Sequence, residues 1–354
     1  MKYRDKGAGG DLFSFIEHRE KVVALNLGIC KLNDVIDWEI FRPRLEKVLG
    51  YSDRDPRKGG RPPFDPVMML KVLVLQKYHG LSDHATETQI ADRFSFLRFL
   101  GLSPGDDIPD ENTIWDFREA LASGHGAERD CGFEGLFDEF LGHLEAAGMV
   151  GHEGSLVDAT FVEAPRQRNS REENQQIKEG RRPKGFEPDT AKGRQKDCDA
   201  RWTKKGGQNH YGYKNHAKVD AKSKLITRYK ATPASVHDSQ MIKDLVDEKD
   251  NALFADSAYA GEEIETYILE TCDCEDFIQL RPYRNRPLNE EDKQTNKLRS
   301  RIRCRVEHVF GRLEHMGANN VRGIGLKRAA AQIGLANLVY NIDRFVLLRR
   351  NQLS

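Results

Sequence analysis

The spacing of apolar residues changes near Gly151, and this change most constrains what the chain can fold into. Before it, apolar residues such as Ile36 and Ile40 recur at the spacing of an amphipathic helix. After it, residues 155–162 form a short apolar run interrupted by one carboxylate, which is typical of a buried strand. The sequence therefore predicts a helical part followed by an α/β part.

The helical part covers residues 36–148. Pro66 begins a long apolar run and Gly80 ends it, as suits a helix that starts at proline and stops at glycine. Two further helices are expected over 83–100 and after Asp110. Short helices separated by glycine-bearing turns predict a helix-turn-helix DNA-binding domain. An ordinary helical packing domain fits the same pattern.

The α/β part covers residues 149–350. Strand and helix patterns alternate along it, which predicts a mixed sheet flanked by helices. The strands are expected at 154–163, 211–220, 225–232, 252–256 and 277–281, and the helices at 238–246, 262–270 and from 290 onward.

Two segments lack the pattern of a packed element. Residues 166–206 contain few large hydrophobic residues and many Arg, Lys, Gln and Asn. Such a segment buries too little apolar surface to offset the entropy lost on ordering. We expect a basic loop there that is disordered, or that DNA orders. Residues 1–35 are expected to form an arm that is partly flexible.

Charge is distributed unevenly along the chain. Lys+Arg 56 and Asp+Glu 56 give a net charge of zero, which by itself argues against a nucleic-acid partner. By segment, the charge is −10 over 1–165, +11 over 166–230, −11 over 231–280 and +10 over 281–350. A run of charge is usually a solvated face, but the two strongly basic segments predict contact with phosphates.

The remaining composition excludes other classes of protein. The apolar stretches are too short to cross a bilayer, and the N-terminus lacks the apolar segment that directs secretion. The six cysteines form no Cys-x-x-Cys pair, which argues against a disulfide framework and a zinc knuckle. We therefore expect a cytoplasmic protein without a membrane partner.

Three acids occupy positions suited to catalysis. Asp158 lies inside the first apolar strand, Asp256 lies at the C-terminal end of a later strand, and Glu307 lies on a basic helix. Open α/β sheets place their sites at the C-terminal ends of strands. Such a trio can hold two Mg²⁺ or Mn²⁺ ions roughly 4 Å apart, which activate a water or a 3′-hydroxyl and stabilise the leaving oxygen of a phosphodiester. Carboxylate oxygens favour these ions over zinc.

Each acid also has an ordinary structural explanation. Asp158 can be a hydrogen-bonded acid in a strand, and Asp256 can cap the turn that follows it. Glu307 can pair with Arg303, four residues earlier on the same helix face. The three acids together indicate catalysis more specifically than each acid alone. An acid in a strand, an acid at a strand end and an acid on a helix follow one another in the order found in a ribonuclease-H-like nuclease. We therefore assign residues 149–350 to the ribonuclease-H-like fold class.

The combined motifs resemble the bacterial insertion sequence five transposases, one of the DDE transposase families. The resemblance extends over about residues 36–345. The motifs that carry it are Gly154-Ser-Leu-Val-Asp158-Ala-Thr, Asp199-Ala-Arg-Trp202, His210-Tyr-Gly-Tyr213-Lys214-Asn-His216, Thr232-Pro-Ala-Ser-Val-His237-Asp238, Phe254-Ala-Asp256-Ser-Ala-Tyr259 and Arg303-Cys-Arg-Val-Glu307-His. The stretches Arg61-Pro-Pro-Phe and Pro109-Asp-Glu-Asn-Thr are similar to the family's N-terminal domain.

The resemblance implies a metal-binding catalytic triad of Asp158, Asp256 and Glu307. Its cofactors would be two Mg²⁺ or Mn²⁺ ions. Arg303 matches the family arginine one turn before the glutamate, from where its guanidinium can reach a DNA phosphate.

Two positions depart from the related tyrosine–arginine–glutamate–lysine signature. Ser300 stands in place of the tyrosine, and Glu314 stands in place of the lysine. Arg312 is a candidate substitute for that lysine as a phosphate contact.

Further DNA contacts are expected on the basic segments and beside the triad. Trp202 can stack on an unpaired base, or it can anchor its loop to the body of the protein. His237 can donate to a phosphate, whereas the adjacent Asp238 is expected to cap a helix. The DNA-binding candidates besides Arg303 and Arg312 are Lys204, Lys205, Lys214, Trp202 and His237.

Together these expectations describe one function. The resemblance implies a transposase that binds the terminal inverted repeats of its own element, cleaves the DNA ends and joins the freed 3′-hydroxyls to target DNA. Its partners would be double-stranded DNA and further copies of the chain in a dimeric or larger synaptic complex, at the bacterial nucleoid. Two alternatives remain: a metal-dependent nuclease that cuts without joining, and a catalytically silent DNA-binding protein derived from a transposase.

Overall fold

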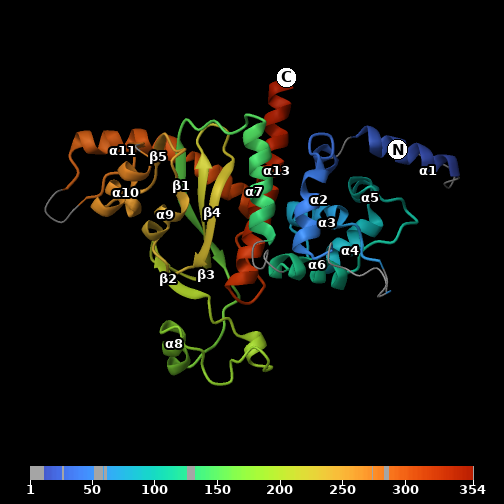
Figure 1. The fold of residues 1–354 in the computed structure, drawn as a ribbon, viewed down its shortest axis with the longest axis horizontal. Coiled ribbons are helices and arrows are strands. Elements are labelled where there is room, and N and C mark those ends of the chain that lie inside the picture. Colours follow the sequence, from blue (N-terminus) through green and yellow to red (C-terminus); the bar gives the residue numbers. More distant parts are fainter. Residues whose placement is uncertain are drawn as a thin grey trace, which may run out of the picture.

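The predicted division into a helical part and an α/β part is present in the computed structural model (Figure 1). The structure describes residues 12–25, 28–51, 59, 62–125, 132–272, 274–282 and 287–353. The first eleven residues of the expected N-terminal arm, and Arg61, lie outside the described residues. In the described part of the chain, no helix has both the length and the apolar character needed to cross a membrane.

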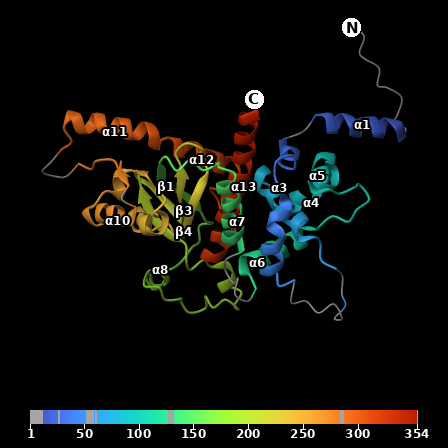
Figure 2. The ribbon, with the colours of Figure 1, turned by 45° about the horizontal axis from the view of Figure 1, so that its top comes forward.

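The helical part is built from seven α-helices and two 3₁₀ turns among the described residues (Figure 2). The prediction for the long apolar helix is confirmed at both ends. The Asp65 carboxylate accepts from the backbone N–H groups of Val67 and Met68, and Gly80 ends the helix with a φ of +64°. The elements are α1 (Leu12–Ala24), Gly28–Leu32, Trp38–Phe41, α2 (Arg42–Val48), α3 (Pro66–His79), α4 (Asp83–Asp92), α5 (Phe94–Leu100), α6 (Glu111–Ser123) and α7 (Gly132–Ala146).

The prediction of a single helix over residues 83–100 is wrong, because this segment forms two helices. Arg93 has an extended backbone, with φ −109° and ψ 113°, and it separates α4 from α5. The hydroxyl of Ser82 caps α4, while the apolar residues of α5 turn inward so that Phe96 and Phe99 are buried. A helix-turn-helix mode of DNA binding therefore stays a prediction for this domain.

The α/β part contains one six-stranded mixed sheet in the order β2-β3-β1-β5-β6, with β4 also paired to β3. β1, β2 and β4 are antiparallel to β3, whereas β5 is parallel to β1 and to β6. This mixed sheet flanked by helices fits the expected fold class. The strands are β1 (Ser155–Glu163), β2 (Arg201–Lys205), β3 (Gln208–Asp220), β4 (Ile226–Pro233), β5 (Ala252–Phe254) and β6 (Glu275–Asp276).

The segment 166–206 differs from the disordered loop that its composition predicts. It contains α8 (Arg171–Lys178) and the strand β2. Ser170 and Glu173 form a reciprocal capping box at the start of α8. Ile177 and Phe186 are buried, and the Asp197 carboxylate accepts from the hydroxyl of Tyr213 at 2.7 Å. A few anchors and side-chain caps thus order a segment in which large hydrophobic residues are scarce.

The C-terminal helix α13 (Leu326–Leu353) lies between the sheet and the helical part, beside α7 (Figures 1 and 2). One continuous apolar core includes residues of α3, α7, α12 and α13 together with Leu156 and Val219 of the sheet. A second core, around Val157 and Tyr259, covers the other face with α9 and α10. The remaining helices are α9 (Ile242–Leu245), α10 (Glu262–Cys272), α11 (Glu290–Arg303) and α12 (Arg305–His315).

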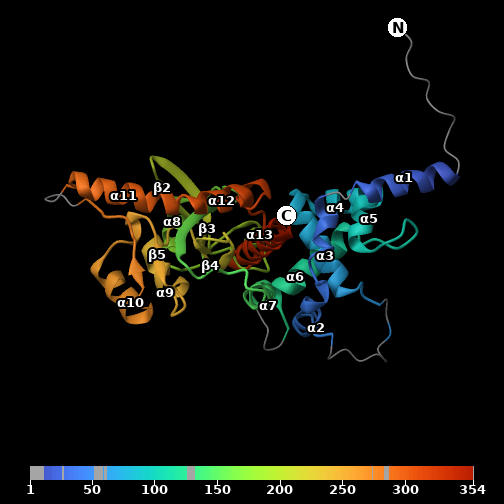
Figure 3. The same ribbon diagram turned by 90° about the horizontal axis from the view of Figure 1, so that it is seen from above.

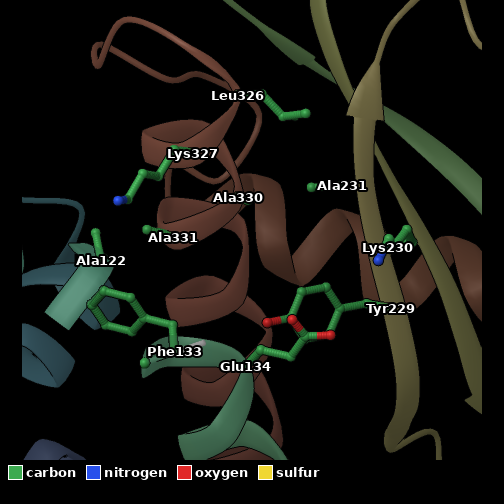
Figure 4. Close-up of a pocket in the computed structure, with 11 residues that line it drawn as sticks. Ala122, Phe133, Glu134, Tyr229, Lys230, Ala231, Leu326, Lys327, Ala330 and Ala331 are labelled. Carbon is green, nitrogen blue, oxygen red and sulfur yellow. The ribbon is translucent and has the colours of Figure 1, made fainter. Parts of the chain in front are cut away.

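A mainly apolar cavity of about 360 Å³ marks the junction of the two parts (Figure 4). Its walls come from α6, α7, β4 and α13, and they include Phe133, Tyr229 and Leu326. Glu134 is the acid among its lining residues. Because none of the three candidate catalytic acids lines it, this cavity is not the catalytic site.

Asn341 joins α13 to the sheet, and its loss should destabilise the protein. Its fully buried side-chain amide accepts from the N–H of Ile226 at 2.9 Å and donates to the Ile226 carbonyl at 2.8 Å. Asn341→Ala leaves both backbone groups unsatisfied, so the free energy of unfolding should fall by about 2–4 kcal/mol. Thermal melting of the variant measures the loss. Asn209→Ala, at an exposed position of β3, is the control; equal melting temperatures for the two variants would contradict the assignment.

Candidate active site

Asp158, inside β1, lies level with Asp256, which follows the C-terminal end of the neighbouring parallel strand β5. Leu156 of β1 is paired with Phe254 of β5, and the two acids follow two residues later in the same register. The charge of Asp256 acts on Asp158, so the two carboxylates are electrostatic neighbours. Asp256 also accepts from the N–H of Ala258 at 2.9 Å, so its expected turn-capping role is present as well.

Glu307 is connected to this strand end by Arg303. α11 ends at Arg303 and α12 begins after Cys304, which places Glu307 in the first turn of α12 (Figure 3). The Nη1 atom of Arg303 donates to Asp158 Oδ2 at 2.6 Å, and its Nη2 atom is 3.5 Å from Glu307 Oε1. One guanidinium therefore bridges the strand acid and the helix acid. The side chain of Glu307 is 65% exposed, whereas those of Arg303 and Asp158 are only 19% and 12% exposed.

The site disfavours the ionised form of Asp158. Burial raises the pKa of its carboxyl to about 6, and the neighbouring charge of Asp256 adds to the rise. The backbone N–H of Ala159, 2.8 Å from Oδ1, and the charges of Arg303 and Lys205 act in the opposite direction. The ionised carboxylate would gain more from an added cation here than it would in water.

The three acids fit a hard divalent cation. They offer only carboxylate oxygens, the ligands that Mg²⁺ and Mn²⁺ prefer. Arg303 already supplies positive charge between Asp158 and Glu307, so this place in the structure favours a cation. The carboxylate oxygens of the three acids do not surround a single point, as expected for carboxylates that repel one another.

Another group of possible metal ligands lies on the helical part. His84, Glu87 and Glu111 have ligand atoms within 4.8 Å of one another, the only such group found among the described residues. His84 Nδ1 is 3.4 Å from Glu111 Oε2, and Glu87 accepts from the backbone N–H of Glu111 at 2.9 Å. These exposed contacts join α4 to α6, which accounts for the group without a metal.

Lys214 does not have the exposed position that a DNA contact requires. It is buried, and its Nζ atom donates to Asp238 Oδ1 at 2.7 Å and to the Val236 carbonyl at 2.7 Å. The prediction that Asp238 caps a helix is wrong: His237 holds that position, and Asp238 is the buried partner of Lys214. The charge of a lysine buried in the sheet is costly without a nearby carboxylate. Asp238, which follows β4, supplies this carboxylate to Lys214.

Two further buried residues, His216 and Tyr259, lie near this pair, and both belong to the family-like motifs without a role assigned from the sequence. His216 donates or accepts at Thr232 Oγ1, 2.8 Å away, and burial lowers its pKa to about 4. The hydroxyl of Tyr259 is buried without a hydrogen-bond partner. Burial raises the pKa of Tyr259 well above its usual value, with added effects from the charges of Asp238, Asp158 and Asp256.

Arg312 makes contacts within the protein, and its contact with a phosphate stays a prediction. Its Nε atom donates to Asp343 at 2.9 Å, and its guanidinium lies 5.2 Å from the centre of the Tyr78 ring. It therefore ties α12 to α13 and α3. Glu314, in place of the family lysine, is exposed and accepts from the side-chain amide of Asn319 at 3.3 Å.

The other predicted DNA contacts are exposed, three on β2 of the β2–β3 hairpin and one just before the 3₁₀ turn Asp238–Met241. Lys204 and Lys205 lie on β2, and the Nζ atom of Lys205 is 3.9 Å from Asp238 Oδ2. Trp202 is 49% exposed, with its ring 5.0 Å from that of Tyr211. His237 is exposed, and its Nδ1 atom accepts from the N–H of Ser239. Contact between these four side chains and DNA stays a prediction.

The mixed sheet flanked by helices, which follows a helical part in the chain, fits an α/β domain of the ribonuclease-H-like kind. Residues 150–342 match the family described as Transposase DDE domain, and residues 17–120 match the one described as Transposase domain (DUF772). The first match covers more than half of the chain, which therefore belongs to the DDE transposases. No solved structure matches the chain. The prediction of a DDE transposase is confirmed, and its DNA substrates follow from the family.

The raised pKa of Asp158 predicts how stability changes with pH when no metal is present. Its folded-state pKa of about 6 exceeds its ordinary value of 3.8, so the folded protein binds more protons than the unfolded chain between these values. Stability should therefore fall as pH rises through this window. Asp158→Asn cannot ionise, so it should be more stable than the wild type by about 3 kcal/mol above pH 6, and equal to it near pH 4.

Thermal melting in EDTA from pH 4 to pH 8 measures this difference. Glu270→Gln, at an exposed acid of α10, is the control and should follow the wild type across the range. Parallel profiles for Asp158→Asn and the wild type would mean that ionisation of Asp158 does not destabilise the fold.

Proposed function

We propose that the chain is an insertion sequence five transposase. It would bind the terminal inverted repeats of its element, cleave the DNA ends and join the 3′-hydroxyls to target DNA. The proposal is carried by two observations: Asp158 lies level with Asp256 on neighbouring strands, and Arg303 pairs with both Asp158 and Glu307. The family motifs in the sequence support the assignment to the insertion sequence five group.

The three acids would hold two Mg²⁺ or Mn²⁺ ions. When bound, the ions supply an activated water or 3′-hydroxyl and stabilise the leaving oxygen of the phosphodiester. Asp158 and Asp256 are fixed by the strands, whereas Glu307 is exposed and can adjust to the DNA. Arg303 neutralises two acids in the free protein. Once those acids have another cation, its guanidinium can hold a phosphate through two parallel hydrogen bonds.

The β2–β3 hairpin is the proposed DNA grip beside the acids. Its exposed Lys204 and Lys205 belong to the basic segment 166–230, and the charge of Lys205 already acts on Asp158. Phosphates drawn to these lysines would therefore lie near the catalytic carboxylates. We propose that the helical domain recognises the terminal repeats, and that two or more copies of the chain hold the two ends together.

The central test is DNA cleavage by single-acid variants. Asp158→Ala, Asp256→Ala and Glu307→Ala should each reduce Mg²⁺-dependent cutting of the element's ends by at least about 10³-fold, because each removes a ligand of the reacting centre. End binding, measured by gel retardation, should remain within a few-fold. Glu270→Gln should cut like the wild type. A triad variant that cuts normally would remove its residue from the catalytic set.

Strand transfer separates the proposed transposase from the two alternatives. Pre-cleaved ends with free 3′-hydroxyls are incubated with a supercoiled plasmid, and joined products are counted by electrophoresis. A transposase joins them, whereas a nuclease only cuts the plasmid. A silent DNA-binding protein would do neither.

Binding of the metal can be measured without catalysis. Mn²⁺ at about 100 times its dissociation constant should raise the free energy of unfolding by about 2.7 kcal/mol, because only the folded chain assembles the three acids. The matching rise in melting temperature should be lost in Asp256→Asn and kept in Glu270→Gln. An equal rise in both variants would place the metal elsewhere.

A further inference from the structure

A cavity of about 610 Å³ lies beside Glu307 and is not explained by the three acids. Its volume is within the range of small-molecule sites. It follows the edge of β1 that β5 leaves uncovered, since β5 pairs with β1 only at residues 155 and 156. The next partner of that edge is the segment at Asn319, whose carbonyl accepts from the N–H of Glu163. One face of α12, from Glu307 to Glu314, forms the opposite wall.

Aromatic rings line this cavity from both walls. On the sheet side, Phe161 of β1 and His210 of β3 are stacked, with ring centroids 4.1 Å apart and planes within 4°. On the helix side, Phe310 lies one turn after Glu307. Flat rings facing a cavity suit a flat aromatic ligand, and stacking of a nucleobase on such a ring contributes about 1–3 kcal/mol.

The polar groups of the cavity distinguish a base from a phosphate. Glu163, Glu307 and Glu314 all line it, so a phosphate inside would be repelled. The amino group of a base is a neutral donor that matches these carboxylate acceptors. His210 Nδ1 is buried 3.5 Å from Glu163 Oε1, so this carboxylate holds the ring of His210 at the cavity wall.

Positive charge lies just outside the aromatic wall. The Nζ atom of Lys205 is 5.8 Å from the centre of the Phe161 ring, and its side chain is half-exposed. Arg303 lies on the other side of Glu307, toward Asp158. If the base of a nucleotide entered the cavity, its phosphate would lie near Lys205 and Arg303. Its base would lie near the carboxylate acceptors that line the cavity.

We propose that this cavity binds a single unstacked nucleobase that carries an amino group, from the DNA strand whose phosphodiester lies at the three acids. The inference rests on the proposed function, because it takes the ligand to be DNA at that site. Unstacking a base requires a few kcal/mol, which the contacts with Phe161, His210 and Phe310 would offset. Bound in this way, the base would fix the position of the adjacent phosphate.

The test uses the full chain and the single-stranded pentanucleotide d(TT-2-aminopurine-TT) at low salt in EDTA, where no cleavage can occur. Fluorescence anisotropy reports binding, and the intensity of 2-aminopurine reports stacking of the base. We expect the intensity to fall on binding. His210→Ala and Phe310→Ala should weaken binding about tenfold and abolish the fall in intensity, in line with the loss of one stacking contact.

Two variants control for damage to the fold. His210→Phe keeps a flat ring beside Phe161 and should keep the fall in intensity, even if His210→Ala is destabilised. Trp115→Ala removes an aromatic ring that is 45% exposed on α6, and it should behave like the wild type. An unlabelled d(CCCCC) should compete better than d(TTTTT), because thymine has no amino group.

The outcomes separate the base site from the proposed function. If the oligonucleotide binds but its 2-aminopurine intensity does not change, DNA binding stands and the base site is refuted. If the intensity falls equally in the wild type and in both alanine variants, the base stacks elsewhere and the site is refuted. If the protein binds neither this oligonucleotide nor double-stranded ends, the proposed function fails with it.

Discussion

The ion pair between Arg303 and the two acids Asp158 and Glu307 is the interaction on which the site depends. A buried carboxylate inside β1, such as that of Asp158, would be costly without a positive partner. The guanidinium supplies that partner, and it also fixes α11 and α12 against the strand. The same cation therefore stabilises the free protein and keeps the place where metal and phosphate charges are expected to meet.

Buried lysines of the sheet are paired with carboxylates. This pairing explains how a chain with many charged residues can form a buried sheet. Lys214 is paired with Asp238, and Lys218 with Asp250 at 3.0 Å, each pair being buried beside apolar strands. Breaking one partner of such a pair leaves an uncompensated buried charge. Part of the charge of the basic segments is therefore paired inside the protein, and the part on the β2–β3 hairpin is exposed, where we propose that it contacts DNA.

The elements that could be predicted from the sequence are those with a strong local pattern. The ends of α3 at a proline and a glycine, the strand that contains Asp158 and the strand that ends before Asp256 all follow from period and spacing. The contacts that could not be predicted are between distant residues. Nothing local in the sequence indicates that Arg312 pairs with Asp343, or that Lys214 is neutralised by Asp238. The ordered structure of residues 166–206 could not be predicted, because a few buried side chains change the overall composition of the segment very little.

The position of α13 has a consequence for shortened copies of the gene. Its residues pack on the helical domain and on the sheet within one apolar core, so neither half is complete without the last 28-residue helix. A chain that stopped before this helix would expose apolar surface on both halves and would be expected to aggregate or be degraded. Copies of the element that lose the end of the gene should therefore be inert, and should not persist as competitors for the DNA ends.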